Sequence, residues 1–196
     1  MHGIPEALEA AHHFGVKIIP GVEISAMFYP CGDGAEELVH ILAYYGSCGP
    51  TKWEEVGAFL DKIRAGRFVR AKEMVSKLGN LKMPLQMEHI TRIAGDGVAP
   101  GRVHVARALV EAGHVATLRQ AFDKYLYDGG PAYSIGAEPT AEDTVRLIKE
   151  TGGVAVLAHP WTIKNPAAVV SRLKNAGLHG LEVYRSDGKQ PGTDYF

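Results

Sequence analysis

The sequence predicts an α/β fold that is interrupted by a helical subdomain. Strand-like apolar runs alternate with helical patterns toward both ends of the chain, whereas residues 50–131 contain consecutive helical patterns. The length of 196 residues is enough for one sizeable domain with an insertion. We therefore assign residues 1–49 and 132–196 to an α/β domain and residues 50–131 to a helical insertion.

The first segment predicts a helix followed by strands. The helix is expected from Pro5 to Phe14, with the proline in its first turn and Gly15 at its end. The strand candidates are β-branched or apolar runs at 16–19, 22–25 and 38–42. Because these runs are apolar on both faces, we expect them to belong to a sheet that helices cover.

The middle of the chain predicts helices throughout. Thr51 begins a capping-box pattern, and the helix that follows is expected to end near Gly79, with Gly66 as a point where it could break. Three shorter helices, each followed by glycine, are expected over 86–94, 102–112 and 117–127.

The last segment returns to alternating helices and strands. Thr140 is expected to cap a helix that precedes a buried strand at 154–158. Asn165 and the proline after it predict the start of another helix, which Gly177 ends before a last strand at 180–184.

Composition excludes several classes of protein. Apolar residues make up 46% and charged residues 22%, as in ordinary globular domains, and the formal net charge of −1 gives no basic field for duplex DNA. The apolar runs are too short to span a bilayer, and the N-terminus does not resemble a signal peptide. Two cysteines form no disulfide framework. We therefore expect an intracellular, cytoplasmic protein.

Polar residues in two strand candidates could carry chemistry. Glu23 lies in an apolar run, where a carboxylate needs a cation or hydrogen bonds; the alternative is a solvent-exposed edge or an ion pair with a basic side chain. His40 interrupts the run at 38–42, and neutral imidazole is a common metal ligand, although a lone histidine there is usually a hydrogen-bonded core residue.

Three other residues are candidates because of where they lie relative to a predicted strand or helix. His159 follows the strand at 154–158, and the carboxyl ends of strands in α/β folds face the ligand crevice; the alternative is a turn histidine fixed by the next proline. Arg102 and His104 begin a helix after Gly101, where backbone N–H groups favour anions, so Arg102 could bind a phosphate with support from His104. The alternative is that Arg102 is a surface charge.

Five segments together resemble the PHP (polymerase and histidinol phosphatase) domain. They read IPGVEIS at 19–25, HIL at 40–42, GRVH at 101–104, GPAY at 130–133 and GVAVLAHP at 153–160. The likeness is strongest to small phosphoesterases that act on nucleoside phosphates or on the 5′ ends of RNA. It implies a distorted (β/α)7 barrel with a helical insertion, and up to three divalent ions, Mn, Fe or Zn, at the carboxyl ends of the strands.

The resemblance also implies roles for individual residues. Glu23 would bridge two metals, His40 and His159 would be further ligands, and Glu23 and His159 would belong to the catalytic centre. Arg102 and His104 would bind the substrate phosphate. The segment GTDY at 192–195 is similar to the family's closing motif and makes Asp194 another candidate metal ligand.

The sequence also departs from the family pattern. An early His-x-His pair and an Asp-His pair are missing, and Phe196 stands where the closing motif has a histidine. The chain is therefore expected to be a truncated phosphoesterase with impaired activity. The alternative is a catalytically inactive fragment that binds a phosphate ligand or a protein partner.

Overall fold

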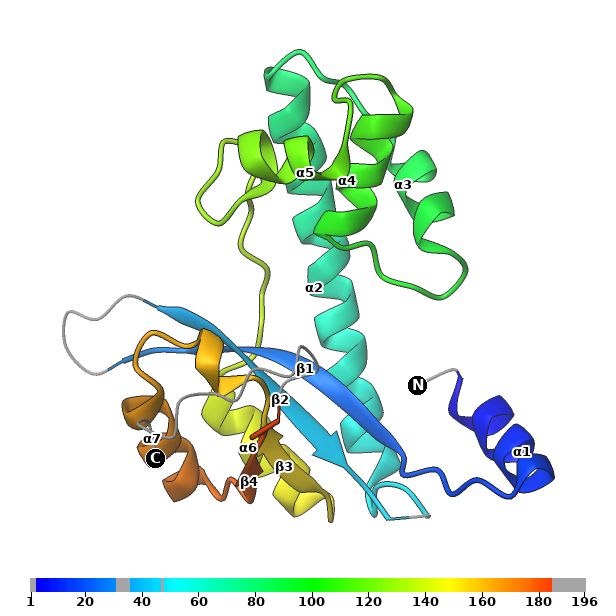
Figure 1. Cartoon of the computed structure of the whole chain (residues 1–196), viewed down its shortest axis with the longest axis vertical. Helices are drawn as coiled ribbons and strands as arrows, with labels where there is room; N and C mark the ends of the chain where they lie inside the picture. The colour runs from blue at the N-terminus through cyan, green and yellow to red at the C-terminus, as the bar shows by residue number, and fades with distance from the viewer. Residues whose placement is uncertain (1–2, 31–35, 47, 185–196) are drawn as a thin grey trace. The chain divides into compact units, whose positions relative to one another are not determined.

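The chain divides into two compact units. The structure, a computed structural model, describes residues 3–30, 36–46 and 48–184 (Figure 1). Unit 1 comprises Met1–Phe59 and Glu138–Phe196, and unit 2 comprises Leu60–Ala137. Each unit is described below by itself.

The sheet of unit 1 has four strands in the described part of the chain. They are β1 (Gly21–Phe28), β2 (Glu37–Tyr44), β3 (Val154–Leu157) and β4 (Gly180–Leu181), and they lie side by side in this order. Strand β2 pairs antiparallel with both β1 and β3, whereas β3 and β4 are parallel. The mixed α/β class predicted from the sequence is confirmed, and β1, at one edge of the sheet, forms an antiparallel pair with β2.

One face of this sheet is buried and the other carries polar side chains. Helix α6 (Ala141–Glu150) packs against β1, β2 and β3, and α7 (Pro166–Ala176) packs against α6. Alternate residues of the strands are buried: Ile24, Ala26, Val39, Ile41, Ala43, Ala155 and Leu157. Because side chains alternate between the faces, Glu23 and His40 lie on the opposite, accessible face.

The predicted caps of α6 and α7 are confirmed. The Thr140 hydroxyl accepts a hydrogen bond from the Asp143 N–H, and the Asn165 side chain accepts one from the Ala168 N–H. Gly177 ends α7 with φ of 109°, a left-handed conformation that glycine adopts without steric cost. These caps fix the ends of the two helices that support the sheet.

Two strand predictions were wrong: one predicted strand does not form, and another is shorter than predicted. Residues 16–19 form no strand: Val16 and Ile19 are 58% and 63% exposed, and this run pairs with no strand among the described residues. Strand propensity alone did not suffice, because a strand also needs a hydrogen-bonded neighbour and a face to bury. The last strand covers only 180–181 of the predicted 180–184. Helix α1 (Ile4–Phe14) matches its prediction within one residue.

Unit 2 is helical. Helix α2 (Trp53–Asn80), whose residues from Leu60 onward belong to this unit, is continuous through Gly66. It is followed by α3 (Met87–Ala94), α4 (Arg102–Glu111) and α5 (Leu118–Ala121), after which η1 (Phe122–Leu126) is a π-helical turn. Their shared core includes Ala71, Met74, Leu78, Ile90, Val105, Leu109 and Leu126, all fully buried. The helices predicted for this region are confirmed, except that the fourth changes to π geometry halfway.

No helix in the described ranges combines the length and the apolar character that a transmembrane segment requires.

Candidate metal centre

The register of the antiparallel pair β1–β2 brings Glu23 and His40 together. Glu23 pairs with Leu42 and Ser25 pairs with His40, so Glu23 and His40 are diagonal neighbours on one face. Diagonal side chains in an antiparallel pair are within reach of each other when one is long. The Glu23 Oε1 atom lies 2.8 Å from His40 Nδ1.

His159 reaches the same place from the end of β3. The Ala158 N–H donates to the His40 carbonyl at 2.9 Å, which holds the chain beside β2 up to the residue before His159. The His159 N–H then donates to Glu182 Oε2 at 2.7 Å. His159 has φ of 31° and ψ of 57°, a left-handed conformation that is uncommon for a residue other than glycine. Such conformations cluster at functional sites.

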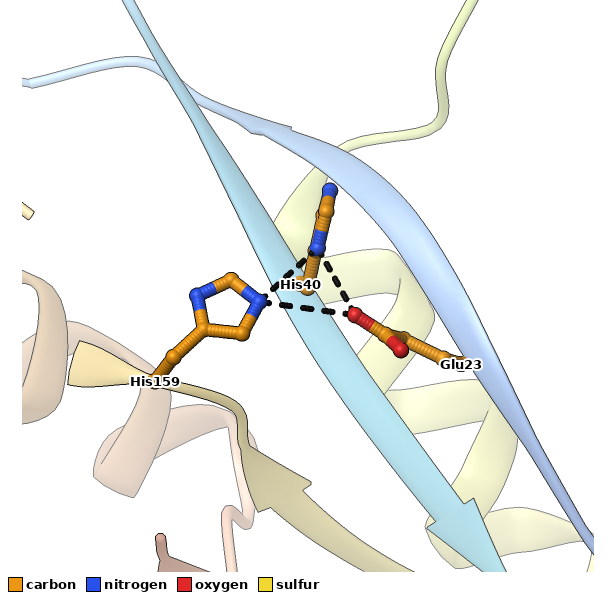
Figure 2. A group of neighbouring side chains, drawn as sticks. All are labelled: Glu23, His40 and His159. Atoms are coloured by element: carbon orange, nitrogen blue, oxygen red, sulfur yellow. Dashed lines mark hydrogen bonds and ion pairs between the residues drawn. The ribbon is translucent and has the colours of Figure 1, made fainter. Parts of the chain in front are cut away.

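The three side chains point at one another (Figure 2). His159 Nε2 lies 3.0 Å from His40 Nδ1 and 3.4 Å from Glu23 Oε1. The side chains of Glu23, His40 and His159 are 49%, 30% and 32% exposed, so solvent and ligands reach the group. The structure therefore brings together three residues that the sequence singled out from distant segments.

The spacing of these donor atoms fits a divalent cation. Nitrogen and oxygen ligands bound at about 2.0–2.2 Å to one metal are separated from each other by about 3–3.5 Å. The three atoms here are 2.8–3.4 Å apart and belong to one carboxylate and two imidazoles. Their lone pairs repel one another unless a cation or a shared proton lies among them. This donor set suits Mn²⁺, Fe²⁺ or Zn²⁺.

Two residues around His159 were not singled out from the sequence. Glu182 accepts the bond from the His159 N–H, and the Thr162 hydroxyl lies 3.1 Å from His159 Nδ1. Glu182 is an acidic residue in the predicted last strand, and Thr162 is three residues after His159 in a turn. The spacing of three residues is a signal that could have identified Thr162, whereas Glu182 is too far from His159 in the sequence for a local signal.

Arg102 lies in unit 2 and has partners within that unit. Its Nη1 donates to the Leu126 carbonyl at 3.3 Å and to the Asp128 carboxylate. Its guanidinium carbon lies 5.4 Å from the centre of the Tyr133 ring, in a cation–π contact. Arg102 is thus oriented by side chains that follow it in the sequence.

His104 also lies in unit 2, where it caps α4. Its Nδ1 accepts a hydrogen bond of 2.9 Å from the Gly101 N–H, so this nitrogen is unprotonated. Burial, and then the positive charge of Arg107, lower the pKa of the His104 imidazole. Asp194, the remaining predicted ligand, lies outside the described residues.

Known proteins with similar sequences are phosphatases and ribonucleases. The chain is 32% identical over 185 residues to a 3′,5′-nucleoside bisphosphate phosphatase of Chromobacterium violaceum, and the match covers 92% of this chain and 62% of that one. It is 34% identical over 190 residues to a 5′-3′ exoribonuclease of Haemophilus influenzae, covering 92% and 64%. The chain thus spans somewhat less than two thirds of these relatives' length.

Solved structures agree with this result, although no family model matches the sequence. A crystal structure described as that of a metal-dependent phosphoesterase from Bifidobacterium adolescentis superposes with a TM-score of 0.78 at 28% identity, covering 96% of this chain and 65% of that one. A structure described as an amidohydrolase from Chromobacterium violaceum, with bound sulfate, superposes with a TM-score of 0.77 at 30% identity, covering 95% and 66%. The chain is therefore a homologue of PHP-family phosphoesterases over most of its length, as its motifs indicate.

Proposed function

We propose that this protein is a metal-dependent phosphoesterase that hydrolyses phosphate esters of nucleotides or of RNA. The observation that carries the proposal is the cluster of Glu23, His40 and His159, whose donor atoms lie 2.8–3.4 Å apart on the accessible face of the sheet. The names of the homologues favour hydrolysis over non-catalytic binding of a ligand.

The cluster would hold Mn²⁺, Fe²⁺ or Zn²⁺, with Asp194 as a further ligand. A divalent cation bound there lowers the pKa of a coordinated water and neutralises charge on the phosphate oxygens. The Glu23 carboxylate would contribute the negative charge that retains cations, and it would be the bridging ligand if two were bound. His40 and His159 contribute neutral nitrogens. Glu23 and His159 thereby define the catalytic centre.

Arg102 and His104 would bind the phosphate of the substrate. A guanidinium can donate two parallel hydrogen bonds to phosphate oxygens. Asp128, the present partner of Arg102, has a side chain that is 78% exposed. The ion pair is therefore accessible to a competing phosphate. His104 holds the first turn of α4 through Gly101, and N–H groups at a helix start favour anions.

The fold that we propose for the whole protein is the PHP barrel. The sheet of unit 1 would form part of a distorted (β/α)7 barrel, and unit 2 would be its helical insertion. The substrate would be a nucleoside phosphate or the 5′ end of an RNA. Duplex DNA is not an expected partner, because the net charge of −1 provides no general basic surface.

The proposal is tested by hydrolysis assays with and without metal. The purified protein, loaded with Mn²⁺, is expected to release phosphate from adenosine 3′,5′-bisphosphate or nucleotides from a 5′-phosphorylated RNA, at a reduced but measurable rate. Glu23→Gln keeps the shape of the side chain but removes its charge, and should abolish hydrolysis. Glu150→Gln, at an exposed position on α6, is the matched control and should remain active.

Two results would overturn the proposal. One is metal binding to the wild-type protein without hydrolysis of either substrate. The other is hydrolysis that persists after Glu23→Gln or after complete removal of metal.

A further inference from the structure

We propose that Thr162 is a positioning residue that keeps the proton of the His159 ring on Nδ1 and leaves Nε2 free for a cation. This inference extends the proposed metal site and depends on it. It concerns a residue that neither the motifs nor the candidate ligand set includes.

Thr162 contacts both the backbone and the ring of His159. The short 3₁₀ turn Pro160–Thr162 follows the histidine, and the Thr162 N–H donates to the His159 carbonyl at 3.0 Å. The Thr162 Oγ1 lies 2.9 Å from the same carbonyl oxygen and 3.1 Å from His159 Nδ1. Among the described residues, Thr162 is the hydrogen-bond partner of Nδ1.

The number of available protons decides the direction of these bonds. A hydroxyl has one proton to donate and can accept through its lone pairs. A carbonyl oxygen only accepts, so the 2.9 Å contact requires the hydroxyl proton of Thr162. Oγ1 must then accept from Nδ1–H. Because a neutral imidazole carries one N–H, Nε2 is left with a lone pair.

The free nitrogen is the one that faces the cluster. Nε2 lies 3.0 Å from His40 Nδ1 and 3.4 Å from Glu23 Oε1. In the opposite tautomer a proton on Nε2 would occupy the space among these atoms, where a cation would bind. The position of one proton therefore decides whether His159 can complete the site.

Hydrogen bonds hold the backbone of His159 in place, and this supports the contact between its Nδ1 atom and the Thr162 hydroxyl. The His159 N–H donates to Glu182 Oε2 at 2.7 Å, and the His159 carbonyl accepts from the Thr162 hydroxyl. The residue keeps φ of 31° between these two bonds. Outer hydrogen-bond partners of metal-binding histidines commonly fix the tautomer, and their loss weakens metal affinity about 10–100-fold.

Metal affinity is the first test. Zn²⁺ binding is measured by calorimetry for the wild-type protein, Thr162→Val, which is isosteric but lacks the hydroxyl, and Thr162→Ser, which restores it. We expect Thr162→Val to bind at least about 10-fold more weakly and Thr162→Ser to bind like the wild type. Thr91→Val is the matched control, since the Thr91 hydroxyl also bonds a carbonyl of its own helix, at 2.7 Å. Unchanged affinity in Thr162→Val would overturn the proposal.

The tautomer itself is the second test and needs no metal. The ¹⁵N chemical shifts of the His159 ring are measured in the metal-free protein at alkaline pH, where imidazole is neutral. We expect Nδ1–H in the wild type and in Thr162→Ser, and a mixture of tautomers in Thr162→Val. A purely structural role for Thr162 would leave the tautomer unchanged.

The two tests separate the possible failures. A wild-type protein with Nδ1–H on His159 but no Zn²⁺ binding would contradict the proposed metal site while leaving the role of Thr162 in the tautomer intact. A wild-type protein with Nε2–H on His159 would overturn the inference about Thr162, whatever its metal affinity. If Thr162→Val does not fold, the wild-type and Thr162→Ser spectra still give this decision.

Discussion

The cluster in unit 1 and the Arg102–His104 pair in unit 2 differ in how their polar atoms are satisfied. In unit 1, one carboxylate oxygen of Glu23 and one ring nitrogen each of His40 and His159 point at one another, 2.8–3.4 Å apart, so a proton or a cation must lie among them. In unit 2, Arg102 donates to Asp128 and His104 accepts from the Gly101 N–H, so each has a partner of opposite character.

This difference shows how a cation would act at the cluster in unit 1 and how an anion would act at the Arg102–His104 pair in unit 2. In unit 1 a cation can take the place of a shared proton among the three atoms, because each of them has a lone pair when it is deprotonated. In unit 2 Arg102 is already paired with Asp128, so an anion competes with this carboxylate for the guanidinium. Metal affinity should therefore respond strongly to changes in unit 1, and substrate affinity should respond more moderately to changes in unit 2.

The largest expected effect is the loss of metal after removal of a histidine from the cluster. We expect His40→Ala and His159→Ala each to weaken Zn²⁺ or Mn²⁺ binding by at least about 100-fold, more than the loss typical of an outer partner. Calorimetry and the metal content after dialysis measure the effect. His12→Ala, at an exposed position of α1, is the control and should retain the metal. If His40→Ala and His159→Ala also retained the metal, the proposed difference between the cluster in unit 1 and the Arg102–His104 pair in unit 2 would be wrong.

A moderate effect is expected for Arg102→Ala. A charge-assisted hydrogen bond contributes about 1.5–3 kcal/mol, so kcat/KM should fall about 10–100-fold. Metal content should be unchanged, because a guanidinium cannot ligate a cation. Arg119→Ala is the control, since the Arg119 side chain is 90% exposed and is paired within its own helical region. A loss of metal in Arg102→Ala would contradict the assignment of Arg102 to phosphate binding.

The smallest effect concerns the pH dependence of stability through His104. Its pKa is lowered in the folded state from the ordinary 6.5, chiefly by burial. As the pH falls, the unfolded chain therefore takes up a proton before the folded protein does. The stability that His104 contributes is complete above the unfolded-state pKa and is lost as the pH falls through the folded-state pKa.

His104→Asn checks this sign. Asparagine can accept the bond from the Gly101 N–H through its side-chain oxygen, but it does not titrate. We expect the urea midpoint of the variant to fall less than that of the wild type between about pH 7.5 and pH 5. An equal or larger fall in the variant would show that the His104 proton is not coupled to folding.

Local sequence signals predicted the helices better than the strands. Thr140, Asn165 and Gly177 determine helix ends through bonds to nearby residues, so their effects could be predicted. The run at 16–19 has strand propensity but pairs with no strand in the described ranges. The short connection between β1 and β2 is compatible with an antiparallel hairpin and too short for a parallel crossover. The exact register could not be predicted, because it depends on contacts across the sheet.

The candidate site could be predicted in part for a similar reason. Glu23 and His40 interrupt apolar strands and His159 ends one, which makes them visible in the sequence. Their mutual distances depend on register and on the turn after β3. The pairing of Arg102 with Asp128 and the bond between His159 and Glu182 join residues far apart in sequence, so no local pattern indicated them.

Locating a bound metal in a crystal tests the central claim most directly. Crystals of the protein grown with Zn²⁺ should show an anomalous scattering peak within about 2.0–2.2 Å of His40 Nδ1, His159 Nε2 and a Glu23 carboxylate oxygen. Ordered density for all three side chains with no peak among them, at a Zn²⁺ concentration that calorimetry shows to be saturating, would contradict the account.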